Sequence, residues 1–324
     1  MKRGKIHFNA HPSQNVIDFG ADSTPEYAAA SSNDASAAIH KPHVSSHCFR
    51  YLCMGSGSSG NCSYLGTQQG GILIDAGVKP DFVEQSLKDN GISLDSIKGI
   101  LLTHDHNDHI QYVYRLLRGQ RNLRLFCTNR VINGLMQRHN ISKRIREYHT
   151  PIFKEIPFKI LDFEITAFDV PHDGTDNMGF NITLGDRNFV IATDMGAVSE
   201  RAYHYISRAN FLVVEANYDL AMLHNGRYPE YLKARIQTQN GHMDNVMTAQ
   251  LLTRIAGHGL EYVFLCHLSK DNNTPEVALA TVGGALARAG FKVGADTETI
   301  TDRAADLILT ALPRFEATRL YVLR

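Results

Sequence analysis

The stretch Leu101-Leu102-Thr103-His104-Asp105-His106-Asn107-Asp108-His109 places three imidazoles and two carboxylates within six consecutive residues, directly after an apolar run. Imidazole and carboxylate are ligands of borderline and hard divalent metals. Side chains of an extended segment alternate, so His104 and His106 point the same way. A helix that starts near Asn107 would turn Asp108 and His109 toward the same point. The alternative is a polar turn rich in histidine, but the spacing favours a site for two adjacent metals.

Three later residues supply what such a site still needs. His172, Asp194 and His267 each come just after a run that reads as a strand. Any one of them alone would more often be an ordinary loop residue. Together with the first cluster, they add further imidazoles and a bridging carboxylate, so we expect them at the same site.

A further carboxylate ends the run 71–76, GILIDA, which reads as a buried strand and precedes Gly77. An acid in this position is well placed to accept the free N–H of a ligand histidine and to fix its tautomer. We therefore expect Asp75 to support the metal ligands from behind.

The segment 113–146, which follows the cluster, carries nine lysines and arginines and no aspartate or glutamate. The whole chain of 324 residues has 33 basic and 33 acidic residues, so this local bias stands out. It suits a polyanionic substrate such as a nucleic acid backbone, which Arg115 and Arg118 would contact. The alternative is the solvated face of two helices, although such faces usually mix both signs.

The run 55–61, GSGSSGN, joins two short strand-like runs and reads as a hairpin turn. We favour the plain turn. The alternative is a nest of backbone N–H groups that binds an anion beside the metal site. In that case Ser58, Ser59 and Asn61 would contact the substrate.

Strands and helices alternate along residues 48–324, with the reactive side chains after strands, which indicates one α/β domain. Residues 1–47 are poor in large aliphatic side chains, so we expect a disordered N-terminal extension there. Residues 217–240 read as an irregular insert. Asp244 or Asn245 is the expected N-cap of the helix that follows.

The composition predicts a cytoplasmic protein. Its five cysteines are scattered and include no CxxC pair, which is typical of reduced thiols. No apolar run approaches the ~18–20 residues of a membrane span. The basic start of the chain lacks the apolar run of a secretory signal. We expect no membrane contact, and the sequence leaves the oligomeric state open.

The chain resembles the metallo-β-lactamase superfamily over roughly residues 49–324. Its five motifs occur in the order of that family, at Asp75, the run 104–109, His172, Asp194 and His267. This resemblance implies an αββα sandwich with the site at one edge, between two sheets. The ligand set that it implies is His104, His106 and His172 for one divalent ion, Asp108, His109 and His267 for the other, and Asp194 as the bridge. Zn²⁺, Mn²⁺ and Fe²⁺ all suit such ligands.

A finer resemblance is to the YycJ and WalJ group of that superfamily, in the segments GSGSSGNCSYL, ILIDAG, LLTHDHNDH, YPEYLKARI, GHMDN and LCHLSKDNNTPE. It implies an exonuclease that acts on duplex DNA in DNA repair. The chain departs from the group at residues 1–47 and at Met243-Asp244, where Leu-Ser is expected. The candidate substrate contacts in these segments are Tyr228, Lys233, Arg235 and Asn273.

The segment GHMDN also resembles the distal part of tRNase Z, where a histidine pairs with a glutamate at the end of a preceding strand. Carried over to this chain, the pair is His242 and Glu215, with His242 as a general acid. The predicted catalytic residues are thus Asp108, His242 and Glu215, acting with a hydroxide that two metals activate. We favour a DNA exonuclease. The alternatives are an RNA-processing nuclease, a thioester or lactone hydrolase, and a nucleic-acid-binding scaffold on a decayed hydrolase fold.

Overall fold

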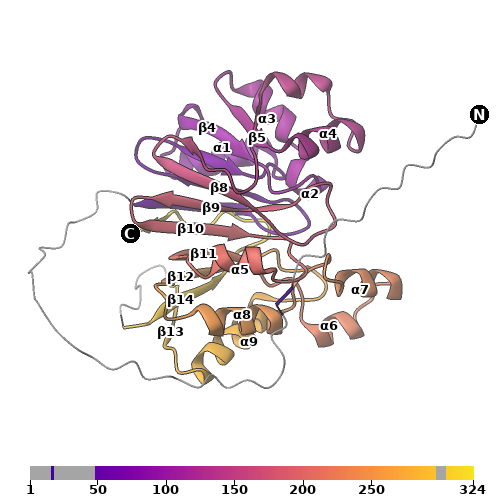
Figure 1. Ribbon diagram of the computed structural model, residues 1–324, viewed down its shortest axis with the longest axis vertical. Coiled ribbons are helices and arrows are strands. Elements are labelled where there is room, and N and C mark those ends of the chain that lie inside the picture. Colours follow the sequence, from indigo (N-terminus) through magenta and orange to yellow (C-terminus); the bar gives the residue numbers. More distant parts are fainter. Residues whose placement is uncertain (1–15, 18–47, 297–303) are drawn as a thin grey trace, which may run out of the picture.

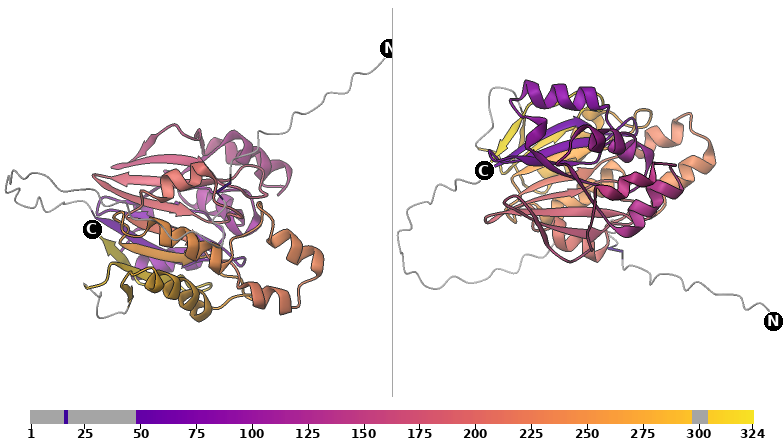
Figure 2. Two further views of the ribbon diagram at one scale, coloured as in Figure 1. Left: turned by 60° about the horizontal axis from the view of Figure 1, so that its bottom comes forward. Right: turned by 90° about the horizontal axis from the view of Figure 1, so that it is seen from above.

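The computed structural model describes residues 16–17, 48–296 and 304–324 (Figure 1). Two sheets pack face to face, and helices cover the outer face of each (Figures 1 and 2). The predicted αββα sandwich is therefore confirmed.

The first sheet has seven strands in the order β15-β1-β2-β3-β4-β5-β6. Its strands are β1 (Phe49–Gly55), β2 (Cys62–Gly66), β3 (Gly71–Ile74), β4 (Ile97–Leu101), β5 (Arg124–Cys127), β6 (His149–Pro151) and β15 (Tyr321–Leu323). The helices of this half are α1 (Pro80–Asp89), α2 (Asn107–Ile110), α3 (Val113–Gly119) and α4 (Asn129–Gln137), with short 3-10 helices η1 (Leu94–Ser96) and η2 (Lys143–Glu147).

The second sheet has eight strands in the order β13-β14-β12-β11-β10-β9-β8-β7. Its strands are β7 (Phe158–Ile160), β8 (Phe163–Asp169), β9 (Met178–Leu184), β10 (Arg187–Ala192), β11 (Phe211–Glu215), β12 (Tyr262–Cys266), β13 (Val293–Ala295) and β14 (Leu307–Ala311). The helices of this half are α5 (Glu200–Ile206), α6 (Leu220–Asn225), α7 (Glu230–Ile236), α8 (Asn245–Ile255) and α9 (Pro275–Arg288).

Aromatic side chains from facing strands fill the space between the sheets. Phe49 of β1 stacks on Phe163 of β8 with ring centroids 5.8 Å apart, and Tyr51 lies 4.8 Å from Phe264 of β12. All four rings are fully buried. Burying a side chain of this size stabilises a fold by roughly 1.5–3 kcal/mol, so these contacts help to fix how the two sheets sit on each other.

Parallel pairing determines where the reactive residues lie. Strands β3, β4 and β5 are parallel in the first sheet, and β10, β11 and β12 are parallel in the second. Carboxyl ends of parallel strands lie at one edge of a sheet. The residues that follow these strands, and that the sequence singled out, are therefore gathered at one edge of the sandwich.

The prediction for the insert 217–240 is wrong, because this segment holds the helices α6 and α7, which project from the sandwich (Figures 1 and 2). Asp219 caps α6 by accepting from the backbone N–H of Met222 at 2.9 Å. These helices are six and seven residues long, too short for a clear apolar period. The predicted cap of α8 is confirmed, since Asp244 accepts from Met247 N at 2.7 Å.

The expected disordered extension lies outside the described residues, apart from Val16 and Ile17. Val16 forms an isolated bridge with Ser199, and the backbone N–H of Ile17 donates to the carbonyl of Val198 at 3.0 Å. The expectation for residues 1–47 stays a prediction. Among the described residues, no helix has the length and apolarity to cross a membrane.

Candidate metal centre

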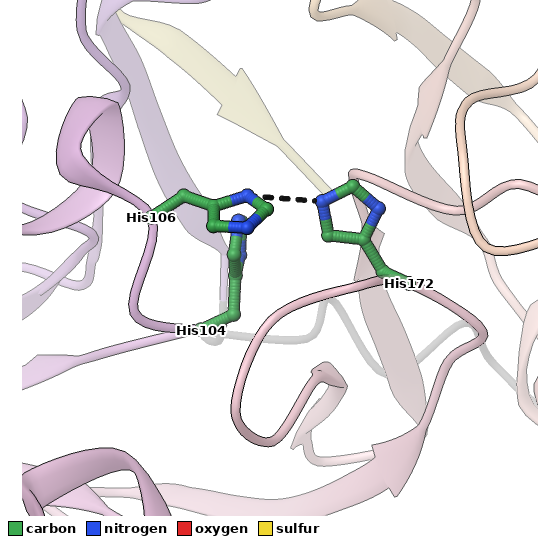
Figure 3. A group of neighbouring side chains, drawn as sticks. All are labelled: His104, His106 and His172. Atoms are coloured by element: carbon green, nitrogen blue, oxygen red, sulfur yellow. Dashed lines mark hydrogen bonds between the residues drawn. The ribbon is translucent and has the colours of Figure 1, made fainter. Parts of the chain in front are cut away.

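Three imidazoles converge from two strand ends (Figure 3). His104 and His106 follow β4, and His172 follows β8. His172 Nε2 lies 3.1 Å from His106 Nδ1, and one ring nitrogen of each residue falls within 4.8 Å of the others. His104 Nε2 is buried and has no hydrogen-bond partner among the described residues. A buried, unpartnered nitrogen in a trio of converging imidazoles fits a metal ligand.

A second group joins the other predicted ligands. His109 Nε2 lies 3.5 Å from an oxygen of Asp108, and His267 Nε2 lies 3.4 Å from the same oxygen. Asp194 contacts both imidazoles, at 3.0 Å from His109 Nε2 and 3.1 Å from His267 Nδ1. It is also close enough to His104 to share a cation with it. The structure thus brings all seven predicted ligands together.

Hydrogen bonds behind the cluster set the direction of two rings. Asp75 accepts from His109 Nδ1 at 2.7 Å and from the backbone N–H of Thr103 at 2.9 Å, so Nε2 of His109 faces the cluster. His172 Nδ1 donates to the carbonyl of Gly241 at 2.9 Å, which leaves Nε2 toward His106. Partners of this kind fix the tautomer of a ligand histidine. Asp75 therefore lies where the sequence placed it, and Thr103 is an additional member that the sequence did not reveal.

Asp105 belongs to the opening stretch but points away from the other groups. Its carboxylate accepts from the backbone N–H of Thr175 at 2.8 Å and also from the Thr175 hydroxyl. It is 1% exposed. Asp105 therefore ties the loop that carries His172 to the end of β4. This tie joins residues 70 positions apart, so no local sequence signal could have shown it.

Three strand ends at the site adopt a left-handed backbone. Asp75, Asp194 and His267 have φ angles of 61°, 50° and 53°, and they follow β3, β10 and β12. Residues with a side chain rarely occupy this region, and each such position costs on the order of 1–3 kcal/mol. The surrounding contacts hold these residues there, which directs their side chains into the cluster.

Glu215 and His242 form the predicted pair. Glu215 is fully buried at the end of β11, and its Oε1 accepts from His242 Nδ1 at 2.7 Å. The same oxygen lies 3.0 Å from His267 Nδ1. Oε2 accepts from the backbone N–H groups of Met195 and Met243, at 2.8 and 3.3 Å. One carboxylate therefore holds His242 and connects it to the cluster.

Charge divides the cluster into two halves. Burial lowers the pKa of His104, His106 and His172, which favours the neutral imidazoles that bind metals. Burial has the same tendency in His267, but Asp194 and the neighbouring carboxylates outweigh it and raise its pKa to about 10.

The carboxylates show the reciprocal effect. Burial alone would raise the pKa of Asp108 and Asp194, yet the adjacent histidines hold both well below their usual range. Both groups therefore stay ionised, and together with Asp75 and Glu215 they line the site with acidic groups that favour a cation.

Several of the predicted substrate contacts have other partners. Asn61 donates to Asp108 at 3.1 Å and lies 2.9 Å from His109 Nε2, so it touches the cluster itself. Its backbone N–H donates to the Asp108 carbonyl. Asn273 is 3% exposed and donates to the Ala216 carbonyl and to Asn245. In the structure Asn61 therefore holds the candidate ligands, and Asn273 connects α8 to the end of β11.

Lys233 and Tyr228 also bond within the protein. The buried Lys233 donates to the carbonyl of His224 at 2.8 Å and to Glu230 at 3.0 Å, so it joins α6 to α7 and is not available to a substrate. Tyr228 donates to Asp271 at 3.0 Å. Arg235 donates to Asp173, which lies 3.3 Å from His106 of the cluster.

The remaining candidates lie on the surface. Ser58 and Ser59 are exposed at the tip of the turn after β1, and Gly57 N and Gly60 N bond within that turn, which supports the plain turn over the nest. Arg115 and Arg118 are exposed on α3. Arg115 pairs with Asp81 at 3.1 Å. Within the described part of the chain, neither arginine forms a hydrogen bond or an ion pair with a residue of the histidine cluster.

An αββα sandwich whose edge gathers histidines and carboxylates around one point defines a metal-dependent hydrolase. Residues 71–267 match the family model of the Beta-lactamase superfamily domain. The protein belongs to the metallo-β-lactamase superfamily, as its motifs indicated.

Two curated relatives share most of their length with the chain. Exodeoxyribonuclease YycJ of Bacillus anthracis is 33% identical over 245 residues, which cover 75% of this chain and 91% of that protein. Exodeoxyribonuclease WalJ of Streptococcus pneumoniae is 32% identical over 269 residues, which cover 83% and 98%.

Solved structures with the same fold include the metallo-β-lactamase fold protein YhfI from Bacillus subtilis. Its TM-score is 0.59 at 13% identity, over 84% of this chain and 99% of that one. A diphosphatase from the PhnP family has a TM-score of 0.55 at 15% identity, over 86% and 99%. At these identities the likeness concerns the fold alone.

Proposed function

We propose that this protein is a metal-dependent exonuclease that hydrolyses phosphodiester bonds in duplex DNA. The observation that carries the proposal is the convergence of all seven candidate ligands beside the Glu215–His242 pair. The names of the curated relatives, which are exodeoxyribonucleases, support DNA as the substrate.

The site would hold two divalent cations. The ligands would be His104, His106 and His172 for the first, Asp108, His109 and His267 for the second, and Asp194 for both. Zn²⁺, Mn²⁺ and Fe²⁺ each fit this set of nitrogen and oxygen donors. When bound, such a pair lowers the pKa of a water between the ions and offsets the charge of a phosphodiester.

The chain's own groups would serve proton transfer. His242 donates from Nδ1 to Glu215 at 2.7 Å, which leaves Nε2 as the nitrogen that exchanges a proton. Burial lowers the pKa of His242, but Glu215 outweighs it and raises that pKa, so the imidazole holds a proton more firmly than usual. A protonated Nε2 is suited to give that proton to the leaving oxygen as the phosphodiester bond breaks.

The segment 113–146 would attract the nucleic acid. All nine of its lysines and arginines are exposed, on α3, β5, α4 and η2 and in the turns next to them. A dense positive surface raises the affinity for a polyanion without a fixed geometry. Some of these charges have local partners, such as Arg144, which bonds Glu147 at 3.3 Å.

A gel assay with end-labelled substrates tests the proposal. Duplex DNA, single-stranded DNA and RNA of one sequence are incubated with the metal-stripped protein after addition of Mn²⁺ or Zn²⁺. We expect progressive shortening of the duplex from an end and none without metal. Preferential cleavage of RNA would overturn the assignment of DNA as the substrate. If none of the three substrates is cleaved with Mn²⁺ or with Zn²⁺, the proposal of a nuclease is wrong.

A further inference from the structure

The three imidazoles of the first candidate metal site are held in different ways. His104 Nδ1 lies 3.0 Å from the hydroxyl of its neighbour Thr103, which is buried. His172 donates to the backbone of Gly241. His106 instead lies at the surface, with its side chain 30% exposed, and its Nε2 is 3.3 Å from Asp173 Oδ1. The same Asp173 oxygen also lies 3.6 Å from His172 Nε2. A carboxylate beside His106 Nε2 favours the proton on that nitrogen, so Nδ1 is the nitrogen that faces His172.

The carboxylate of Asp173 is in turn fixed by α7. Arg235 donates from Nε to Asp173 Oδ2 at 2.8 Å, and its Nη2 forms an ion pair with the same oxygen at 2.5 Å. One charge-assisted hydrogen bond and one ion pair from the same guanidinium limit where this carboxylate oxygen can lie. Each oxygen of Asp173 therefore has its own partner, one in the metal site and one on α7.

A second contact leads from the same end of α7 to the same site. Gly241 packs so closely on this end that a Cβ atom would lie 2.1 Å from the Ile236 carbonyl oxygen and 2.5 Å from that of Arg235. The carbonyl of Gly241 is the one that accepts from His172. The carboxyl end of α7 thus holds two of the three imidazoles.

We propose that Arg235 is a positioning residue that orients His106 through Asp173, so that metal affinity at the first site depends on α7. This inference rests on the proposed metal site. The sequence predicted that Arg235 contacts the substrate. In the structure its guanidinium lies against Asp173, and substrate contact by this 58% exposed side chain stays a prediction.

Metal titration tests this role apart from catalysis. The metal-stripped full chain is titrated with Zn²⁺ against a chromophoric chelator, and we expect two equivalents to bind to the parental protein. For Arg235→Ala we expect roughly 10–100-fold weaker binding of one equivalent, the usual effect of removing a group behind a ligand, and little change in the other. Asp173→Asn should weaken the same equivalent, and Arg235→Lys should lie between.

Arg227→Ala is the matched control. Arg227 is exposed in the same insert, between α6 and α7, so its removal deletes the same charge. This variant should keep both equivalents at parental affinity. Because Arg235 and Asp173 act in series, the double variant should lose no more than either single variant. Thermal melting of each stripped protein shows whether the fold is intact.

Two results would count against the inference, and they are distinguishable from failure of the proposed function. Parental affinity for both equivalents in folded Arg235→Ala would overturn the positioning role alone. Equal losses in Arg235→Ala and Arg227→Ala would also overturn it, because charge and not position would then matter. A parental protein that binds no metal would overturn the proposed function itself.

Discussion

The histidine cluster and the basic segment 113–146 adjoin each other in sequence but are built in opposite ways. In the cluster, His104, His109 and His267 are at most 4% exposed, and the ring nitrogens of His109 and His267 contact carboxylates from other strand ends. In the basic segment every lysine and arginine is exposed. The first region has fixed geometry and the second has charge density.

This difference predicts that catalysis and affinity for a nucleic acid are separable in this protein. Proton transfer and metal binding need side chains held to within a fraction of an ångström. Attraction of a polyanion needs only positive charges near its path. Substitutions in the cluster should therefore change the rate of cleavage, and substitutions in the basic segment should change binding.

Removing a candidate metal ligand should have the largest effect on cleavage and little effect on DNA binding. For Asp108→Ala or His106→Ala we expect cleavage of duplex DNA to fall by about 10³-fold or more, which is ~4 kcal/mol of activation free energy. Affinity for the duplex, measured by fluorescence anisotropy, should stay largely unchanged. Asp186→Ala, an exposed acid in the β9–β10 turn, is the control and should cleave normally. Cleavage at the parental rate in the ligand variants would show that the site is wrongly assigned.

Removing the candidate general acid should have the next largest effect. His242→Ala should slow duplex cleavage by roughly 10²–10⁴-fold, because the leaving oxygen then lacks a proton donor. The loss should be much smaller for a nitrophenyl phosphodiester, whose leaving group needs no proton. Steady-state rates on both substrates check this. An equal loss on both would assign His242 to a structural role.

Asp75→Asn probes the support behind the cluster. The amide keeps the size of the carboxylate but holds His109 Nδ1–H less well, so we expect roughly 10–100-fold weaker metal binding. Chelator competition measures it. The carboxylate of Asp89 on the exposed surface of α1 offers a comparison, since Asp89→Asn should bind metal normally. If Asp75→Asn binds metal with parental affinity, Asp75 does not support the metal ligands.

The smallest effect is expected in the basic segment. The triple variant of Arg121, Arg138 and Lys143 to Ala removes three exposed charges. Each lost phosphate contact should reduce the salt dependence of duplex binding by about 0.9 in the log–log slope. Affinity at low salt should fall, while cleavage at saturating DNA stays near parental. An unchanged slope would show that this segment is an ordinary solvated surface and does not contact DNA.

The sequence was sufficient for features set by local order. A reactive side chain just after a buried strand predicts its place at a sheet edge, and this located Asp75, His172, Asp194 and His267. The cap of α8 was equally local.

The sequence could not predict contacts between residues that are far apart in the chain and that only the fold brings together. Asn61 reaches Asp108 across 47 positions, and Arg235 reaches Asp173 across 62. Both were expected to contact substrate, because a surface-type residue near a motif gives no sign of its partner. Asn273 looked similar, yet burial beside Asn245 determines its role.

The left-handed strand ends at Asp75, Asp194 and His267 make this edge a place where stability and activity oppose each other. Glycine adopts that backbone without cost, so glycine at these positions would relieve the backbone strain. A lineage released from selection for catalysis would gain stability by that route. Sequence optimisation for heat resistance alone would choose the same three positions and produce a more durable, inactive protein.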